Sequence, residues 1–477
     1  MPQFINSNIA SLTAQRNLNT SQNSLTTSLE RLSSGLRINS AKDDAAGLAI
    51  SERFTSQIRG LNQAQRNAND GVSLAQTAEA ALGSSSDMLQ RIRELAVQSA
   101  NATNSDSDRA ALQGEATQLL SELSRVATQS SFNGRNLLDG TFGTVDFQVG
   151  ANAGETIQAS TANFSTSSYG NNQMIGTATT GTATATGSVA ATAFTIAGSA
   201  GTKVFTAPTA GDSMKSVAAA VNAATSTTGV TATAKTETTL AFAATGSHSF
   251  TLKGDSSTAS NISATVSANT PDGLENMVTA INDKAGATGI IAKVNTAGTG
   301  ITLTHNTGEN MVLVDDGAAA TNPGNITVAG QTLTDDATAD TVTVTGQITM
   351  DSEKSFSFTS TGTTIETSGG SALSAVSTID ISTVSGANNA LKIADAALGK
   401  INSQRAAFGA LQSRFESTVN NIQSTSESLS AARSRIRDAD FAQETASLTR
   451  AQILQQAGIS ILSQANSLPQ NVLALLQ

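Results

Sequence analysis

The chain of 477 residues has no cysteine and no tryptophan, and its only tyrosine is Tyr169. Without cysteine it cannot form disulfides, iron–sulfur clusters or thiolate zinc sites. Charged residues make up 13% of the chain and the net charge is −10, which argues against a nucleic-acid role because phosphate binding needs basic patches. No apolar run is long enough to span a bilayer. The first residues show no basic segment followed by an apolar core, so we expect no cleavable signal peptide.

Proline is scarce as well, and residues 3–207 contain none, as long helices require. The spacing of apolar residues predicts a first helix over residues 1–39, a second from Ser40 to about Asn101 and a third from Ser107 to about Gln129. Ser40-Ala41-Lys42-Asp43 has the pattern of a capping box and is expected to start the second helix. The first helix carries a leucine stripe at Leu25, Leu29, Leu32 and Leu36.

The last stretch, Leu391–Gln477, has apolar residues at alternating spacings of three and four, which is the period of a helix that packs along another helix. Long helices that could be its partners lie at the other end of the chain. We therefore expect the two termini to lie side by side, with the middle of the chain inserted between them. These heptads could serve an intramolecular bundle or contacts between chains. The seam of the final segment is expected at Leu454, Ile461, Leu468, Val472 and Leu475.

The middle of the chain has a different composition. Residues 145–149 and 155–159 alternate around a glycine-rich turn, which predicts a β-hairpin. Residues 161–381 are rich in Thr, Ala, Ser and Gly with short apolar alternations, which predicts a β-rich region. That region holds a repeat at an offset of 60 residues, with one short amphipathic helix and a following strand in each copy. Asp212 and Asp272 are the expected N-caps of the two helices.

Residues that could carry catalysis or hold a metal are few. The two histidines, His248 and His305, lie in strand-like stretches, and His305 beside Asn306 is expected at the surface. Asp315-Asp316 and Asp335-Asp336 could meet a calcium ion, because carboxylates are hard oxygen ligands. The spacing of an EF-hand is absent, so solvated turns are favoured. We therefore predict no catalytic, cofactor-binding or metal-binding residues and no cofactor.

Several long motifs at both ends of the chain resemble those of bacterial flagellins. They cover roughly the first 160 and the last 90 residues and leave the middle almost unmatched. At the beginning the resemblance runs through Arg31-Leu32-Ser33-Ser34-Gly35-Leu36-Arg37-Ile38-Asn39-Ser40-Ala41-Lys42-Asp43-Asp44-Ala45-Ala46-Gly47 and Leu89-Gln90-Arg91-Ile92-Arg93-Glu94-Leu95-Ala96. At the end it runs through Ser434-Arg435-Ile436-Arg437-Asp438-Ala439-Asp440-Phe441-Ala442 and Leu468-Pro469-Gln470.

This resemblance implies a structural, non-enzymatic subunit that self-assembles into the flagellar filament for swimming motility. It implies an α+β fold with a long helical coiled-coil or bundle core formed by both termini and a β-rich variable insert that faces solvent. An inner terminal layer is expected from residues 1–40 plus 445–477, and an outer helical core with the hairpin from residues 41–160 plus 385–444. The insert is expected over residues 161–384, with related modules at about 190–250 and 251–313.

The resemblance also implies partners. They are other copies of the chain, the export chaperone, the cap and junction proteins, and a Toll-like innate immune receptor of a host. The chain is expected to be secreted through the flagellar channel to the extracellular flagellum, without membrane insertion or nucleic acid.

The receptor and the filament contacts would share one patch at Arg91, Leu95 and Glu115. Arg91 and Leu95 are four apart and therefore expected on one exposed helical face, while Gly114 could loosen Glu115. Two alternatives remain, which are a hook–filament junction protein and a filament subunit whose insert is an adhesin.

Overall fold

The computed structural model describes residues 7–176, 193–208, 212–256, 258–315, 324–328, 330–334, 340–360 and 368–474, the side chains of residues 468–474 excepted. The chain forms two compact units. The first contains Met1–Thr77, Thr144–Ser160 and Ala407–Gln477, and the second contains Ala78–Gly143 and Thr161–Ala406. The layer limits expected from the sequence concern positions in an assembly and stay a prediction.

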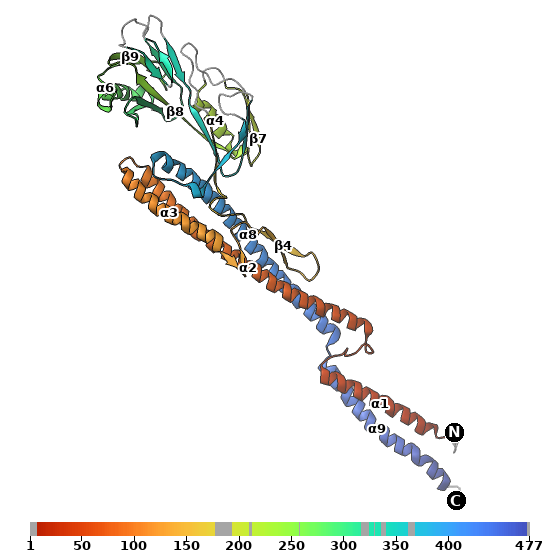
Figure 1. Cartoon of the computed structure of the whole chain (residues 1–477). Coiled ribbons are helices and arrows are strands. Elements are labelled where there is room, and N and C mark those ends of the chain that lie inside the picture. Colours follow the sequence, from red (N-terminus) through yellow and green to blue (C-terminus); the bar gives the residue numbers. More distant parts are fainter. Residues whose placement is uncertain are drawn as a thin grey trace. The chain divides into compact units, whose positions relative to one another are not determined.

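Long helices form at both ends of the chain, and the β-rich region comes from the sequence between them, as predicted (Figure 1). The absence of proline across the N-terminal helices permits uninterrupted i→i−4 hydrogen bonding over these lengths. The helices are α1 (Ile9–Ser34), α2 (Ala45–Ala100), α3 (Asp106–Gln129), α8 (Val384–Arg437) and α9 (Phe441–Ala474).

The junction between α1 and α2 differs from the prediction. Helix α1 ends at Ser34, because Gly35 adopts the left-handed conformation with φ of 72° and its N–H bonds to the Arg31 carbonyl. Asn39 and Ser40 donate to the Asp43 carboxylate in a turn that precedes α2. The expected capping box at Ser40 is therefore wrong. Asp44 holds the start of the helix instead, by accepting the Gly47 N–H at 2.8 Å.

Helix α3 begins with a genuine capping box. The Ser105 side chain accepts from the Asp108 N–H, while the Asp108 carboxylate accepts from the Ser105 N–H. The hydrogen bonds from Ser105 lower the pKa of Asp108.

The first unit contains the predicted hairpin, formed by β3 (Thr144–Gln148) and β4 (Thr156–Ser160). It packs on the helices, because Asn67 of α2 donates to the Gln148 carbonyl at 2.9 Å and Phe147 meets Phe415 of α8 edge-on at 5.4 Å between ring centroids. Glycine at position 71 leaves room for the Phe415 ring.

In the second unit, three antiparallel sheets form the described part of the insert. A short hairpin after α3 lies outside these sheets and consists of β1 (Ser131–Phe132) and β2 (Arg135–Asn136). The largest sheet contains β11 (Ile290–Val294), β12 (Ile301–His305), β8 (Thr231–Phe242), β17 (Gln347–Ser352), β5 (Gly170–Ile175) and β20 (Ala372–Ala375), with β14 (Ile326–Val328) and β15 (Gln331–Leu333) beside β8. The second contains β10 (Ser260–Val266), β9 (Gly246–Lys253), β13 (Met311–Asp315) and β16 (Thr341–Val344). The third contains β19 (Gly369–Gly370), β18 (Ser357–Ser360), β6 (Phe194–Ala197) and β7 (Thr202–Phe205), and the 3₁₀ helix η1 (Val376–Thr378) leads out of the insert.

The repeat is confirmed as a ββααβ unit that occurs twice. Its helices are α4 (Met214–Ala223) and α5 (Thr225–Thr228) in the first copy, and α6 (Pro271–Asn282) and α7 (Ala285–Thr288) in the second. In each copy an asparagine of the longer helix bonds to both backbone groups of an alanine in the next strand. Asn222 does so with Ala232, at 2.8 and 2.7 Å, and Asn282 with Ala292, at 3.0 and 2.8 Å.

The expected N-caps of the two helices are wrong. Helix α4 follows Ser213 and α6 follows Thr270, and neither residue caps through its side chain. Asp272 lies inside the first turn of α6, because Pro271 already occupies a helical position, where its missing N–H costs nothing. Asp272 still suits the helix dipole there.

We expect Gly71→Ala to destabilise the first unit, because the added methyl group would lie 2.6 Å from Cζ of Phe415. Overpacking of this kind costs about 1–3 kcal/mol. Gly83→Ala is the matched control in the same helix, since a methyl group at Gly83 meets nothing within 4 Å. It should stabilise the protein by about 1 kcal/mol through helix propensity. Thermal unfolding followed by circular dichroism measures both, and equal shifts in the two variants would contradict the packing argument.

Candidate functional site

Helices α1 and α9 form an antiparallel pair at the two termini, as Figure 1 shows. At one end the Asn8 side chain donates to the Ala465 carbonyl at 2.8 Å, and Ser11 bonds to Asn466 at 2.7 Å. At the other end Arg31 lies 3.9 Å from the Glu444 carboxylate. The expectation that the termini lie side by side is confirmed for these two helices.

The seam of this pair alternates small residues with half-buried leucines, among them the predicted Leu25 and Leu32. Ala14 and Ser28 of α1 are buried, and the half-buried Ser21 lies midway between them. Ala451 and Ala465 of α9 are buried, with the half-buried Gly458 midway. Each series therefore repeats every seven residues, which keeps it on the facing side of the helix. A heptad count that included alanine, serine and glycine would have found this seam in the sequence.

The predicted apolar stripes lie only partly in that seam. Leu25, Leu32 and Leu36 are half-buried. Leu29 and Leu454 are each 52% exposed, and Ile461 is 60% exposed. The side chains of Leu468 and Val472, and all of Leu475, lie outside the described residues. Further exposed apolar residues on the same pair are Ile9, Leu12, Phe441, Ile453 and Ile459.

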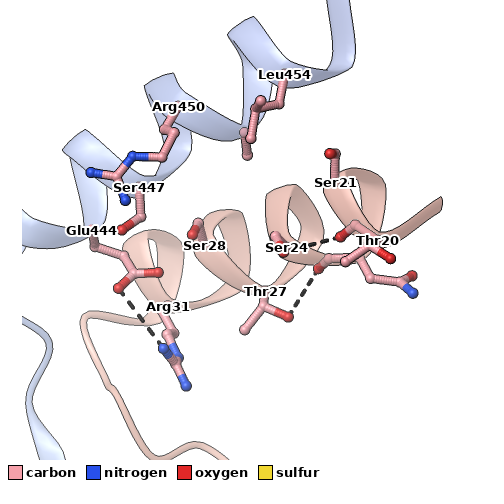
Figure 2. Close-up of a pocket in the computed structure, with 12 residues that line it drawn as sticks. Thr20, Ser21, Ser24, Thr27, Ser28, Arg31, Glu444, Ser447, Arg450 and Leu454 are labelled. Carbon is pink, nitrogen blue, oxygen red and sulfur yellow. Dashed lines mark hydrogen bonds and ion pairs between the residues drawn. The ribbon is translucent and has the colours of Figure 1, made fainter. Parts of the chain in front are cut away.

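A polar groove of about 610 Å³ runs between the two helices, shown in Figure 2. Hydroxyl groups of Thr20, Ser24 and Ser28 line the α1 side, and Arg450 and Leu454 line the α9 side. The groove exists because short side chains do not fill the space between the helices. The exposed apolar side chains on either side of this groove remain available for contact with another molecule.

The second unit carries the predicted patch on α2 and α3. Arg91 donates to Glu115 at 2.9 Å and to Glu94 at 3.0 Å, so it bridges the two helices. These hydrogen bonds, first the one that Glu115 accepts and then the one that Glu94 accepts, raise the pKa of Arg91. The Arg91 and Glu115 side chains are 50% and 45% exposed, which leaves both available for further contacts. Gly114 interrupts neither α3 nor the bond between Arg91 and Glu115.

The expectation that Leu95 shares this exposed face is wrong, since Leu95 is 1% exposed. Helix α2 is covered on two sides at this level, because Arg91 reaches α3 and Arg93 bonds to Asp395 of α8 at 2.6 Å. A helix that packs against two neighbouring helices buries side chains over more of its circumference than a helix that packs against one. Leu95 therefore belongs to the core, and only Arg91 and Glu115 form a surface patch.

Residues that could support metal binding are dispersed. Among the described residues, no three histidine, aspartate or glutamate side chains gather where they could hold a metal ion. Asp315 is buried at the end of β13, whereas Asp316, Asp335 and Asp336 lie outside the described residues. His305 is 1% exposed, so its expected surface position is wrong, because the last residue of β12 turns inward against Gly289. Over the described ranges, no helix is both long and apolar enough to cross a membrane.

Comparisons with known proteins match both helical regions. Residues 5–143 match the bacterial flagellin N-terminal helical region, and residues 391–476 match the bacterial flagellin C-terminal helical region. Residues 193–246, which contain the first copy of the repeat, match the flagellin hook IN motif.

Full-length relatives agree with these matches. A B-type flagellin of Pseudomonas aeruginosa is 45% identical over 496 residues, covering 100% of both chains. A flagellin of Salmonella rubislaw is 38% identical over 526 residues, again covering 100% of both chains, and flagellin D of Vibrio anguillarum is 37% identical over 473 residues and 99% of both. A hook–filament junction protein is therefore not favoured. The chain belongs to the bacterial flagellin family and is a structural subunit of the flagellar filament.

Proposed function

We propose that the exposed apolar residues of α1 and α9 are the surfaces on which neighbouring subunits pack in the filament. The observation that carries this proposal is the arrangement of the pair. Its own seam contains small residues, while Leu29, Leu454 and Ile461 lie at the surface. Soluble proteins rarely leave so many large apolar side chains uncovered along one element. A contact between different surfaces of successive copies repeats without closing and builds a filament.

Polymerisation would also stabilise the pair itself. Helix α1 is rich in serine, threonine and asparagine, which are weak helix formers. Helical stability in proteins comes mostly from the packing of an apolar face. Covering that face with the next subunit would therefore couple the order of the termini to assembly.

The insert faces solvent in this proposal and is dispensable for assembly. Strands β5 and β20, at which the chain enters and leaves it, pair directly with each other, Asn172 opposite Leu373. A short connection between them would thus preserve the base of the insert. Asp351 of β17 connects β5 with α8, because it accepts from Asn171 of β5 at 2.6 Å and from Lys392 of α8 at 2.7 Å. Water can replace these bonds when β17 is removed.

The surface patch of Arg91 and Glu115 is proposed to serve two partners, a neighbouring subunit and a Toll-like innate immune receptor of a host. A guanidinium held in place by two carboxylates presents its remaining donors in a fixed orientation. The export chaperone, the cap and the junction protein are further proposed partners, and the chain is proposed to be secreted through the flagellar channel. No catalytic role is proposed for the filament subunit as such.

We expect Ile461→Gln to raise the critical concentration for polymerisation about tenfold or more, because full burial of such a side chain contributes about 1.5–3 kcal/mol. The monomer should keep its helical signal, since Ile461 is already 60% exposed. Ile461→Leu preserves the apolar volume and is the matched control. Sedimentation of polymerised protein measures the effect, and assembly of the Gln variant at the parent's critical concentration would remove Ile461 from the interface.

Deletion of residues 176–370, joining Ile175 to Ser371, should leave a polymerising subunit. The register of β5 and β20 places the two new neighbours at the end of a two-stranded ladder. Electron microscopy should show filaments of reduced diameter that form at nearly the parent's critical concentration. A folded deletion variant that fails to polymerise would show that the insert carries essential contacts.

Arg91→Ala should lower both receptor activation by the monomer and filament assembly, by about tenfold each if the guanidinium is desolvated at the interface. Arg125→Ala is the matched control, because Arg125 makes a similar exposed ion pair with Glu122 on α3. A reporter-cell assay on monomeric protein and sedimentation of polymer measure the two effects. Equal dose–response curves for Arg91→Ala and the parent would exclude the receptor contact. The sedimentation assay would then test the filament contact by itself.

A further inference from the structure

A half-buried lysine of α8 packs against two buried aromatic rings. Nζ of Lys400 lies 5.9 Å from the ring centroid of Phe164 and 5.8 Å from that of Tyr169. The two rings meet edge-on with 5.6 Å between their centroids, and the two residues are 3% and 2% exposed. Attraction between the ammonium group and the aromatic rings therefore helps to hold the lysine in this place.

The ammonium group has no anionic partner at this place. Within the ranges that the structure describes, it forms neither an ion pair nor a hydrogen bond. Burial raises the pKa of the Tyr169 phenol, so that group stays neutral and adds no negative charge. Burial without a counter-charge disfavours the charged form of Lys400 and lowers its pKa. A larger share of this side chain is therefore the neutral amine, which is the nucleophilic form.

Other lysines of the same unit face carboxylates instead. Nζ of Lys392, in the same helix, lies 2.7 Å from Oδ2 of Asp351. Nζ of Lys215 lies 3.1 Å from Oδ1 of Asp255, and this hydrogen bond is the first cause that raises the pKa of Lys215. An opposite charge at such a distance favours the protonated form. The surroundings of Lys400 differ in kind from these two ion pairs.

Lys400 also lines a pocket of about 500 Å³. Tyr169 and Leu373 supply apolar surface to this pocket, and Leu373 is 42% exposed, so that the pocket is open to water. Pockets that bind small molecules have volumes of about 300–1,000 Å³. The exposed Lys354 lines the same pocket and is therefore a second amine that the same molecules can reach.

We propose that Lys400 is an amine that condenses with small uncharged aldehydes in this pocket. The nitrogen lone pair attacks the carbonyl carbon, and the proton that the nitrogen loses passes through water to the carbonyl oxygen, which gives a carbinolamine. The carbon–oxygen bond then breaks, and the hydroxyl group leaves as water with a second proton from the nitrogen. The products are an imine on Lys400 and one water molecule. Desolvated lysines are activated for this chemistry, whereas an anionic aldehyde would favour the ammonium form again.

The test uses full-length monomeric protein, benzaldehyde and sodium cyanoborohydride, which reduces the imine to a stable benzylamine. Peptide mapping by mass spectrometry then gives the labelling rate of each lysine. At neutral pH we expect Lys400 to react about tenfold faster than Lys354 and Lys392. The ratio of the Lys400 rate to the Lys354 rate should fall as the pH rises through the pKa of Lys400. Above that pH the neutral fraction of Lys400 is complete, while that of an ordinary lysine still grows.

Ser403→Glu separates the missing counter-charge from accessibility. Ser403 is exposed, lines the same pocket and stands at the i+3 position from Lys400, so a glutamate there can pair with the ammonium group. We expect the labelling rate of Lys400 to fall at least about threefold. Asn402→Glu is the matched control, because it adds the same charge to an exposed position of α8 that does not face Lys400. Labelling of Lys400 no faster than that of Lys354, or equal Lys400 rates in the two glutamate variants, would overturn the proposal.

Discussion

The pairing of α1 with α9 is the interaction on which the rest of the structure depends. Ala14 and Ser28 of α1 and Ala451 and Ala465 of α9 are buried, while the large apolar residues Leu29, Leu454 and Ile461 are more than half exposed. Those residues then remain outside the pair. The same arrangement accounts for the pairing of the two ends of the chain and for the apolar surface that we propose another subunit covers.

Much of the helical part follows from periodicity alone. The lengths of α2 and α3, the hairpin of β3 and β4 and the repeat of the insert agree with the patterns that predict them. The boundary between α1 and α2 does not, because Gly35 and Asp44 act through local conformation that a capping-box pattern does not contain. Periodicity also cannot say how many neighbours a helix has, and for that reason it placed the buried Leu95 at the surface.

The insert obeys a different constraint. Its two copies are held by the same backbone-directed asparagines, Asn222 and Asn282, while side chains around Gly229 and Gly289 differ. The shared asparagines are therefore part of what the fold of the unit needs, whereas the side chains around the two glycines can differ without changing that fold. The burial of His305 was not predictable from its polar neighbour Asn306, since it depends on pairing between strands that are distant in sequence.

The central claim is that the apolar residues outside the α1–α9 seam become buried between subunits of the filament. An electron cryomicroscopy map of the assembled filament, at a resolution that shows side chains, tests this directly. The account predicts that Leu29, Leu454 and Ile461 contact a different subunit, while Ala14 and Ala451 remain within one subunit. A filament in which these three large side chains face water, or pack only within their own subunit, would contradict it.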